Sequence, residues 1–340
     1  MSIYRATVLS IQAHHTDFYG TTVRALIHAL DISDITWIDN VTTYSPHIRE
    51  QFPTDTIHDI IGRSTAQAMV IYPTTRYQGN PDRRFVVIDF TDYPILVDKV
   101  YHAPECVRCM AMQRYDPKLP ASDYPRLDAG FFSTNVYYPA ERQLEENKWE
   151  CLPPPPYTGT IDQLFFGGTF QPRSPQRQVI PLLQPSPDVR LVLSTMFPAN
   201  EPGWNRMTGS RPYDYHDYLA VAGEHRAMLA LEGSSGFCYR EFDALRMGMP
   251  LIMSPWRFSS RMEPLVDGVH YLAAQYDTNL ELFAERILRR FNEIRHDQAL
   301  RDRIRRNGQQ WFERNCTIPH ITENLTAWVE DAFATTPPLT

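Results

Sequence analysis

Residues 230–255, ALEGSSGFCYREFDALRMGMPLIMSP, contain the pattern that decides the fold class of this chain. A short apolar run ends at Glu232, and residues 233–236 (GSSG) read as a small-residue turn. A helical pattern follows, and a second apolar run begins after Pro250. Strand, turn, helix and strand in this order make one unit of a parallel α/β sheet.

The turn and the start of the predicted helix suit an anionic ligand. Backbone N–H groups at such a place bind phosphate, which makes Ser234, Ser235 and Gly236 candidate ligand-binding residues. Arg240, early in the helix, would add charge-assisted hydrogen bonds to the same phosphate. The alternative for Arg240 is a surface position with an ion pair to Asp243.

Two carboxylates, Glu241 and Asp243, lie in the same predicted helix. Their oxygens can accept hydrogen bonds from sugar or ribose hydroxyls. Because they are two residues apart, they do not face a ligand together. The stretch as a whole predicts a nucleotide-sugar site.

The rest of the chain repeats the alternation of strands and helices. Apolar runs predict strands at residues 5–12, 35–39, 66–72, 85–90, 162–166, 189–193, 228–231 and 251–254. Helical patterns occupy residues 22–30, 215–223, 280–294 and 298–314. This alternation favours parallel sheets. Four consecutive prolines at 153–156 interrupt it and mark a linker. We therefore expect one domain at residues 1–152, a second at 157–314, and a C-terminal segment at 315–340.

Composition excludes several classes of protein. The net charge of −7 gives no basic footprint for broad nucleic-acid binding. Five cysteines without regular spacing make no disulfide framework, and the single CxxC, Cys106 and Cys109, lacks the further ligands of a zinc site. The N-terminus shows no signal peptide, and no apolar run is long enough to span a membrane. These features favour a soluble cytoplasmic protein.

The second half of the chain resembles the donor-binding domain of GT-B glycosyltransferases. Many of these carry Glu-Gly-Phe-Gly, a second Glu eight residues after the first, and Gly-x-Pro before a strand. Residues 235–238 (SGFC), Asp243 and residues 248–250 (GMP) stand at those places. The text FCYR, which includes Tyr239 and Arg240, is similar to exostosin-like and fucosyltransferase-like members, and residues 267–272 (DGVHYL) resemble a segment that follows in this fold.

The resemblance implies roles for these residues. Tyr239 and Arg240 would bind the donor, with Arg240 on its diphosphate. Asp243 would bind the ribose, with Glu241 in reserve. Ser235 stands where a retaining enzyme carries the first Glu, which favours an inverting enzyme.

A second donor-binding element is predicted just after the strand at residues 162–166. The resemblance implies that Gly168, with Thr169 beside it, lets the backbone approach the donor and that Arg173 meets the diphosphate. Arg177 follows close by. Positive charge of this kind takes the place of a metal ion in offsetting the charge of the leaving group. The alternative is a plain β-turn with exposed arginines.

The catalytic base is expected in the first domain, because an inverting transfer needs a base near the acceptor hydroxyl. Loops after parallel strands are where ligands bind in open α/β sheets. His15 and Asp17 follow the first predicted strand, and Asp92 follows the strand at residues 85–90. For any one of them the alternative is a helix cap or a turn.

These observations predict two Rossmann-like domains that face each other across a cleft in the GT-B architecture. The expected activity is transfer of a hexosyl or pentosyl group from a nucleotide-diphosphate sugar to an acceptor hydroxyl. No metal is expected, because no carboxylate pair has the spacing of metal ligands, and no cofactor is expected beyond the donor. The acceptor is a glycan, a small molecule, a protein or modified DNA. The alternatives are a phage-type enzyme that glycosylates a modified DNA base, a nucleotide-sugar epimerase of the same fold, and a non-catalytic binding module.

Overall fold

The computed structural model describes the chain in eleven segments. They are residues 5–10, 33–39, 68–71, 85–89, 106–111, 127–129, 154–169, 174–194, 215–233, 239–256 and 262–335. The chain divides into two compact units. The first comprises Met1–Cys151, Phe258–Met262 and Cys316–Thr340, and the second comprises Leu152–Arg257 and Glu263–Asn315.

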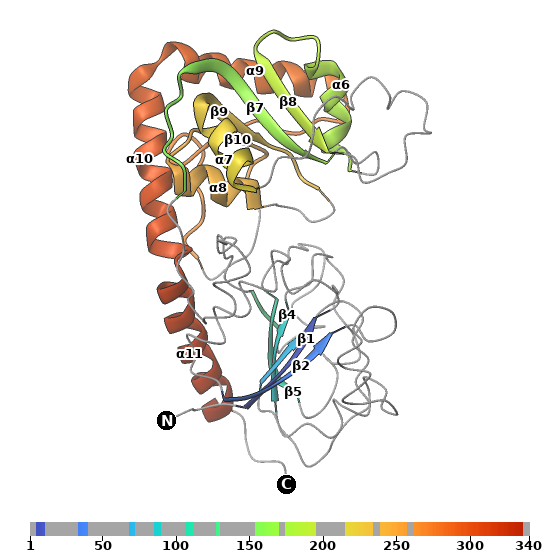
Figure 1. The fold of residues 1–340 in the computed structure, drawn as a ribbon, viewed down its shortest axis with the longest axis vertical. Coiled ribbons are helices and arrows are strands. Elements are labelled where there is room, and N and C mark those ends of the chain that lie inside the picture. Colours follow the sequence, from blue (N-terminus) through green and yellow to red (C-terminus); the bar gives the residue numbers. More distant parts are fainter. Residues whose placement is uncertain are drawn as a thin grey trace. The chain divides into compact units, whose positions relative to one another are not determined.

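The first unit contains a sheet of six parallel strands in the order β2-β1-β3-β4-β5-β6 (Figure 1). The strands are β1 (Arg5–Ser10), β2 (Ser33–Asp39), β3 (Ala68–Ile71), β4 (Phe85–Asp89), β5 (Cys106–Ala111) and β6 (Leu127–Ala129). Strands β1 to β4 coincide with four apolar runs of the sequence. The CxxC motif lies within β5, where its two cysteines are strand residues.

Helix α11 (Ile318–Thr335) belongs to the first unit although it comes at the end of the chain. It contacts β5, where Arg108 forms an ion pair with Asp331. Trp328 is buried, and so is Cys316 just before the helix. The last helix therefore completes the fold of the unit in which the chain begins.

The second unit contains a sheet of five parallel strands in the order β11-β10-β9-β7-β8. The strands are β7 (Ile161–Thr169), β8 (Val189–Ser194), β9 (His225–Ala230), β10 (Leu251–Met253) and β11 (Leu272–Ala273). Strands β9 and β10 are almost entirely buried. Burial on both faces explains why β10, and β9 from Ala227 onward, read as continuous apolar runs in the sequence and do not alternate.

Helices cover both faces of the second sheet (Figure 1). They are the short η1 (Gln176–Val179) and α6 (Ile180–Leu183), then α7 (Tyr215–Glu224), α8 (Tyr239–Met247), α9 (Leu280–His296) and α10 (Gln298–Asn315). Phe166 packs in the core that α6 and α9 share with the sheet. Its neighbour Phe165 packs on Tyr218 of α7, with ring centroids 5.7 Å apart. Because successive strand residues point to opposite faces, α7 covers the face opposite α9.

The end of α8 shows why the chain carries Gly-x-Pro there. Gly248 has a φ of 63°, and its N–H donates to the Leu245 carbonyl at 3.1 Å. The N–H of Met249 donates to the Ala244 carbonyl at 2.8 Å. These two bonds make a Schellman cap, which favours glycine, and Pro250 then cannot continue the helix. The motif therefore ends the helix.

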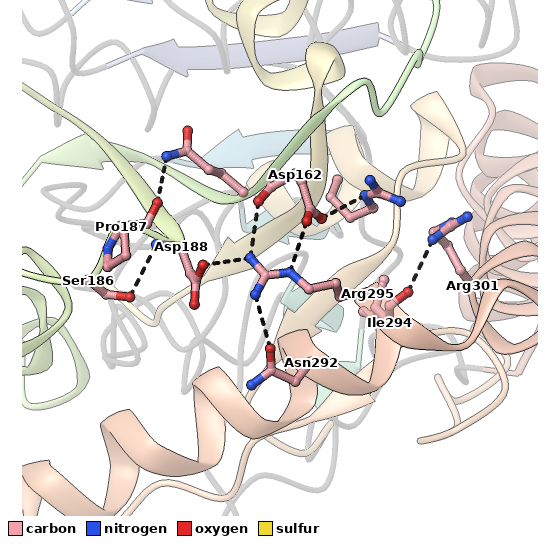
Figure 2. Close-up of polar contacts among 10 residues, drawn as sticks. Asp162, Ser186, Pro187, Asp188, Asn292, Ile294, Arg295 and Arg301 are labelled. Atoms are coloured by element: carbon pink, nitrogen blue, oxygen red, sulfur yellow. Dashed lines mark hydrogen bonds and ion pairs between the residues drawn. The ribbon is translucent and has the colours of Figure 1, made fainter.

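Arg295, in the last turn of α9, ties that helix to the amino ends of two strands (Figure 2). Its Nη2 donates to Asp188 Oδ1 at 2.7 Å, just before β8, and its Nε lies 3.2 Å from Asp162 Oδ2 in β7. The hydrogen bond from Arg295 lowers the pKa of Asp188. Its guanidinium also lies over the Phe291 ring, 4.7 Å from the centroid.

Replacing Arg295 with methionine is expected to lower the free energy of unfolding by about 1 kcal/mol, because half-exposed ion pairs stabilise weakly. The folded pKa of Asp188 is depressed, so its contribution is complete above about pH 4 and is lost as the pH falls through the lower folded value. The difference between wild type and variant should therefore shrink at pH 3. Urea unfolding at pH 7 and pH 3 measures both, with the exposed Arg306→Met as the control. An equal difference at both pH values would contradict the electrostatic account.

Candidate functional site

The order of strands in the second sheet marks one place as the ligand-binding edge. From β7 the chain passes to β8 on one side, and it then returns to β9 on the other side of β7. The carboxyl ends of β7 and β9 therefore flank the topological switch point, where open α/β sheets bind their ligands. The described chain after β9 ends at Gly233 and resumes at the start of α8. The chain that follows Ala230 thus leaves the sheet at this edge.

Gly167 and Gly168 lie at the carboxyl end of β7, and Arg240 of α8 packs directly on them. The Nε of Arg240 donates to the Gly167 carbonyl, and its Cζ lies 5.3 Å from the centre of the Phe166 ring. A Cβ added to Gly168 would lie 2.1 Å from Nη2 of Arg240. Glycine at this position makes room for the guanidinium. The two predicted donor-binding elements are therefore in contact.

The double glycine is part of a strand, so the strand predicted to end at residue 166 continues to Thr169, and the alternative of a plain β-turn is wrong. Strand β7 pairs with β8 as far as Thr169 opposite Ser194. The strand continues through both glycines because their backbone pairs with β8, and side chains from the helices occupy the space that a Cβ would take. At Gly167 that Cβ would lie 2.3 Å from Cε2 of Tyr218. Glycine at these two positions serves close packing against α7 and α8.

Three of the four charged residues of α8 are buried, and Arg246 in its last turn is half-buried. Arg240 is 4% exposed, Glu241 3% and Asp243 2%. The alternative that Arg240 is a surface residue is therefore wrong. Both carboxylates lie inside the fold. The expectation that they do not face a ligand together stays a prediction. Charges in such surroundings interact far more strongly than they do in water.

A buried polar cluster, which the sequence analysis did not identify, lies beside the same edge. Ser174, Gln176 and Arg177, between β7 and α6, are each 4% exposed or less. Ser174 Oγ donates to the Glu232 carbonyl at 2.6 Å, and Arg177 Nε donates to the same oxygen at 3.1 Å. The N–H of Glu232 donates to Gln176 Oε1 at 3.2 Å. Arg177 is thus an internal residue, and the reading of it as an exposed arginine is wrong.

Residues 267–272, which resemble a later segment of the family, do not belong to this edge. They run into β11, and in a parallel sheet the segment before a strand lies at the amino end. Asp267 Oδ1 accepts from the N–H of Ala273 at 2.7 Å, and His270 Nδ1 accepts from the N–H of Val266 at 2.9 Å. Burial lowers the pKa of His270, which favours the neutral ring that this bond requires. These side chains hold a turn.

Several predicted site residues lie outside the described residues. They are His15, Asp17, Asp92, Arg173, Ser234, Ser235 and Gly236. Thr169 is the last residue of β7, and Tyr239 is the first of α8. The first sheet also has a switch point, between β1 and β3. His15 and Asp17 follow β1 in the sequence, whereas Asp92 follows β4, which is further from that point.

The described segments contain no group of three or more His, Cys, Asp or Glu side chains that could hold a metal ion. Within the same segments, no helix has both the length and the apolar character needed to cross a membrane.

The sequence matches no known protein family and no curated protein. Solved structures resemble the fold over nearly the whole chain. Sucrose-phosphate synthase from Thermosynechococcus elongatus superposes with a TM-score of 0.57 at 13% identity, over 98% of this chain and 100% of that one. Anabaena Alr3699/HepE, in complex with UDP-glucose, gives 0.56 at 12% identity over 98% and 100%. A glycosyltransferase from Rickettsia africae gives 0.52 at 12% identity over 98% and 99%.

Likeness at this level of identity establishes the fold. The chain has the fold of the GT-B glycosyltransferases, which confirms the resemblance seen in the sequence of its second half. The α/β class and the parallel sheets are confirmed as well.

Proposed function

We propose that this chain is a glycosyltransferase that moves a sugar from a nucleotide-diphosphate sugar to an acceptor hydroxyl. The observation that carries the proposal is the packing of Arg240 on Gly167 and Gly168 at the carboxyl end of β7. It brings a buried positive charge to the switch point of the second sheet, beside the chain that leaves β9. A diphosphate leaving group needs positive charge at such a place.

The fold supports the same activity. Anabaena HepE, which shares it, was solved in complex with UDP-glucose. In the proposed arrangement the two Rossmann-like units face each other across a cleft, with the donor on the second unit and the acceptor on the first. Arg240 and Arg173 supply the charge that a metal ion supplies elsewhere, so the reaction needs no metal.

The catalytic base in this proposal comes from the first unit. His15 and Asp17 are favoured over Asp92, because they follow the strand at the switch point of the first sheet. The base takes the proton of the acceptor hydroxyl as its oxygen attacks the anomeric carbon, and the nucleoside diphosphate leaves from the opposite side. Inversion is proposed because Ser235 stands where a retaining family member carries Glu.

A thermal-shift screen of UDP, GDP, ADP, CDP and TDP, each with and without EDTA, tests the donor site. A ligand at one hundred times its Kd adds about 2.7 kcal/mol to the stability of the folded protein, so one diphosphate should raise the Tm by several degrees. EDTA should not change that shift. If no nucleotide moves the Tm, the donor site is absent. A shift that EDTA abolishes would overturn the metal-free mechanism.

Turnover of the matching nucleotide sugar separates the proposal from its alternatives. Slow donor hydrolysis by water and faster loss in the presence of an acceptor are expected. An isomerised nucleotide sugar without any acceptor would identify an epimerase. Faster donor loss with DNA that carries hydroxymethylated bases would identify that DNA as the acceptor. Binding without any donor loss would identify a binding module.

A further inference from the structure

The side chains of Ser174, Gln176 and Arg177 all bond the backbone of one residue, Glu232. Glu232 lies beyond the end of β9, so the ladder of the sheet does not provide for its N–H and C=O. Three side chains from the segment after β7 bond both groups, at 2.6, 3.1 and 3.2 Å. The carbonyl accepts two of these bonds, and the N–H donates the third. The position of Glu232 is therefore fixed from one neighbouring segment.

Glu232 lies next to the residues that are predicted to bind the phosphate. Glu232 and Gly233 are the last described residues before residues 234–238, which hold the predicted phosphate-binding turn. The side chains that hold Glu232 come just after residues 170–173, which include Arg173. The bonds thus join the two chain segments on either side of the switch point, at the place where both leave the sheet.

General core packing does not account for this cluster. Apolar side chains would fill the same volume without the cost of burying an amide and a guanidinium. A buried polar group is retained at little net cost only where it is hydrogen-bonded, and its bonds then fix geometry more narrowly than apolar contacts do. Gln176 and Arg177 each make a hydrogen bond to the same residue of the backbone, Glu232.

We propose that Ser174, Gln176 and Arg177 are positioning residues that set the backbone of the donor-binding turn through Glu232. This inference rests on the proposed function, because the ligand of the turn is the diphosphate of the donor. Arg177 acts here through the backbone and does not contact the phosphate. A backbone that is held at Glu232 before the ligand arrives loses less freedom when the ligand binds, so the cluster raises affinity by pre-organisation.

The test compares Gln176→Leu with Gln163→Leu. Gln163 also bonds a backbone carbonyl, that of Pro187 at 2.7 Å, but from the early part of β7 and away from the switch point. Leucine at 176 leaves the N–H of Glu232 without its acceptor, which is expected to weaken binding of the nucleoside diphosphate found in the screen by about tenfold. Hydrogen exchange of the peptide covering residues 231–238, measured without ligand, should become about tenfold faster. Gln163→Leu should change neither, whatever its effect on the Tm.

A conservative variant separates positioning from a loss of packing. Gln176→Glu keeps an oxygen acceptor at the same place and should restore both affinity and exchange to near wild-type values. Ser174→Ala should weaken nucleotide binding and speed exchange because it removes the hydroxyl that bonds the Glu232 carbonyl, whereas Ser174→Thr keeps that hydroxyl and should change neither. If Gln176→Leu leaves both affinity and exchange unchanged while the wild type binds the nucleotide, the positioning role is refuted and the proposed function stands. A wild type that binds no nucleotide refutes both.

Discussion

Gly168→Ala is expected to weaken nucleotide binding by about tenfold or more and to lower the free energy of unfolding by about 1–3 kcal/mol. The added Cβ would lie 2.1 Å from Nη2 and 2.7 Å from Cζ of Arg240. The end of an arginine is flexible and can move away. Its new position, however, would break the bond to Gly167 and remove the guanidinium from the ring of Phe166. The positive charge then leaves the switch point.

A control for Gly168→Ala is available in the same sheet unit. The φ of Gly168 is 156°, and Gly268 also has a positive φ, at 73°. Nothing lies within 4 Å of a Cβ added to Gly268. Gly268→Ala therefore reports the cost of a side chain on a left-handed backbone without any steric contact, about 1–2 kcal/mol. It should leave nucleotide affinity unchanged.

A double-mutant cycle identifies the cause. With Arg240 already replaced by alanine, the atoms that Gly168→Ala displaces are gone, and the second change should cost only backbone strain. Chemical unfolding of the four proteins and calorimetric titration with nucleotide measure the two effects. If the losses from the two substitutions simply add, Gly168 and Arg240 are not coupled and the account of the double glycine is wrong.

The doubly wound sheet of the second unit was largely predictable from the sequence. Strands β9 and β10 are buried on both faces, so each contributes an unbroken apolar run to the sequence, beside a turn or a Gly-x-Pro. Helices α9 and α10 were predicted to within two residues at each end, because polar and apolar residues alternate with a helical period along them. Local patterns in the sequence are enough to predict these elements.

Elements that depend on distant contacts were not predictable. Strand β7 pairs with β8 through Gly167 and Gly168, on which Tyr218 and Arg240 pack, whereas glycine pairs usually indicate a turn. The cluster at Glu232 joins residues that are 55 to 58 positions apart in the chain, and no periodicity marks such a contact. Helix α11 was anticipated only as part of a C-terminal segment, and strands β5, β6 and β11 were missed.

The burial of Arg240 was not predictable for the same reason. An arginine that lies three residues before a carboxylate in a helix reads as an exposed ion pair, because that is the commonest arrangement on helix surfaces. Its burial follows from the two glycines opposite, which lie more than seventy residues earlier in the sequence. Removal of the whole side chain would therefore leave a cavity, and alanine is a poor test of its function.

Arg240→Met is expected to weaken binding of a nucleoside diphosphate on the order of 100-fold, because charge-assisted bonds to phosphate are lost. The change in stability should stay within about 1 kcal/mol, because two effects oppose each other. The Gly167 carbonyl loses its donor, which destabilises, while a charge no longer has to be buried, which stabilises. Methionine retains the volume of the stem and contacts the ring of Phe166 favourably.

Comparison of two ligands decides whether Arg240 meets the diphosphate. The affinity for the uncharged nucleoside should be the same in wild type and Arg240→Met, while that for the diphosphate falls. Arg240→Lys keeps the charge but not the planar donor that bonds Gly167. Its affinity for the diphosphate should therefore lie between those of the wild type and Arg240→Met. Arg226→Met is the matched control, since Arg226 pairs with Asp162 at 3.1 Å near the amino end of β9. A parallel loss of affinity for nucleoside and diphosphate would show that Arg240 shapes the site without contacting the phosphates.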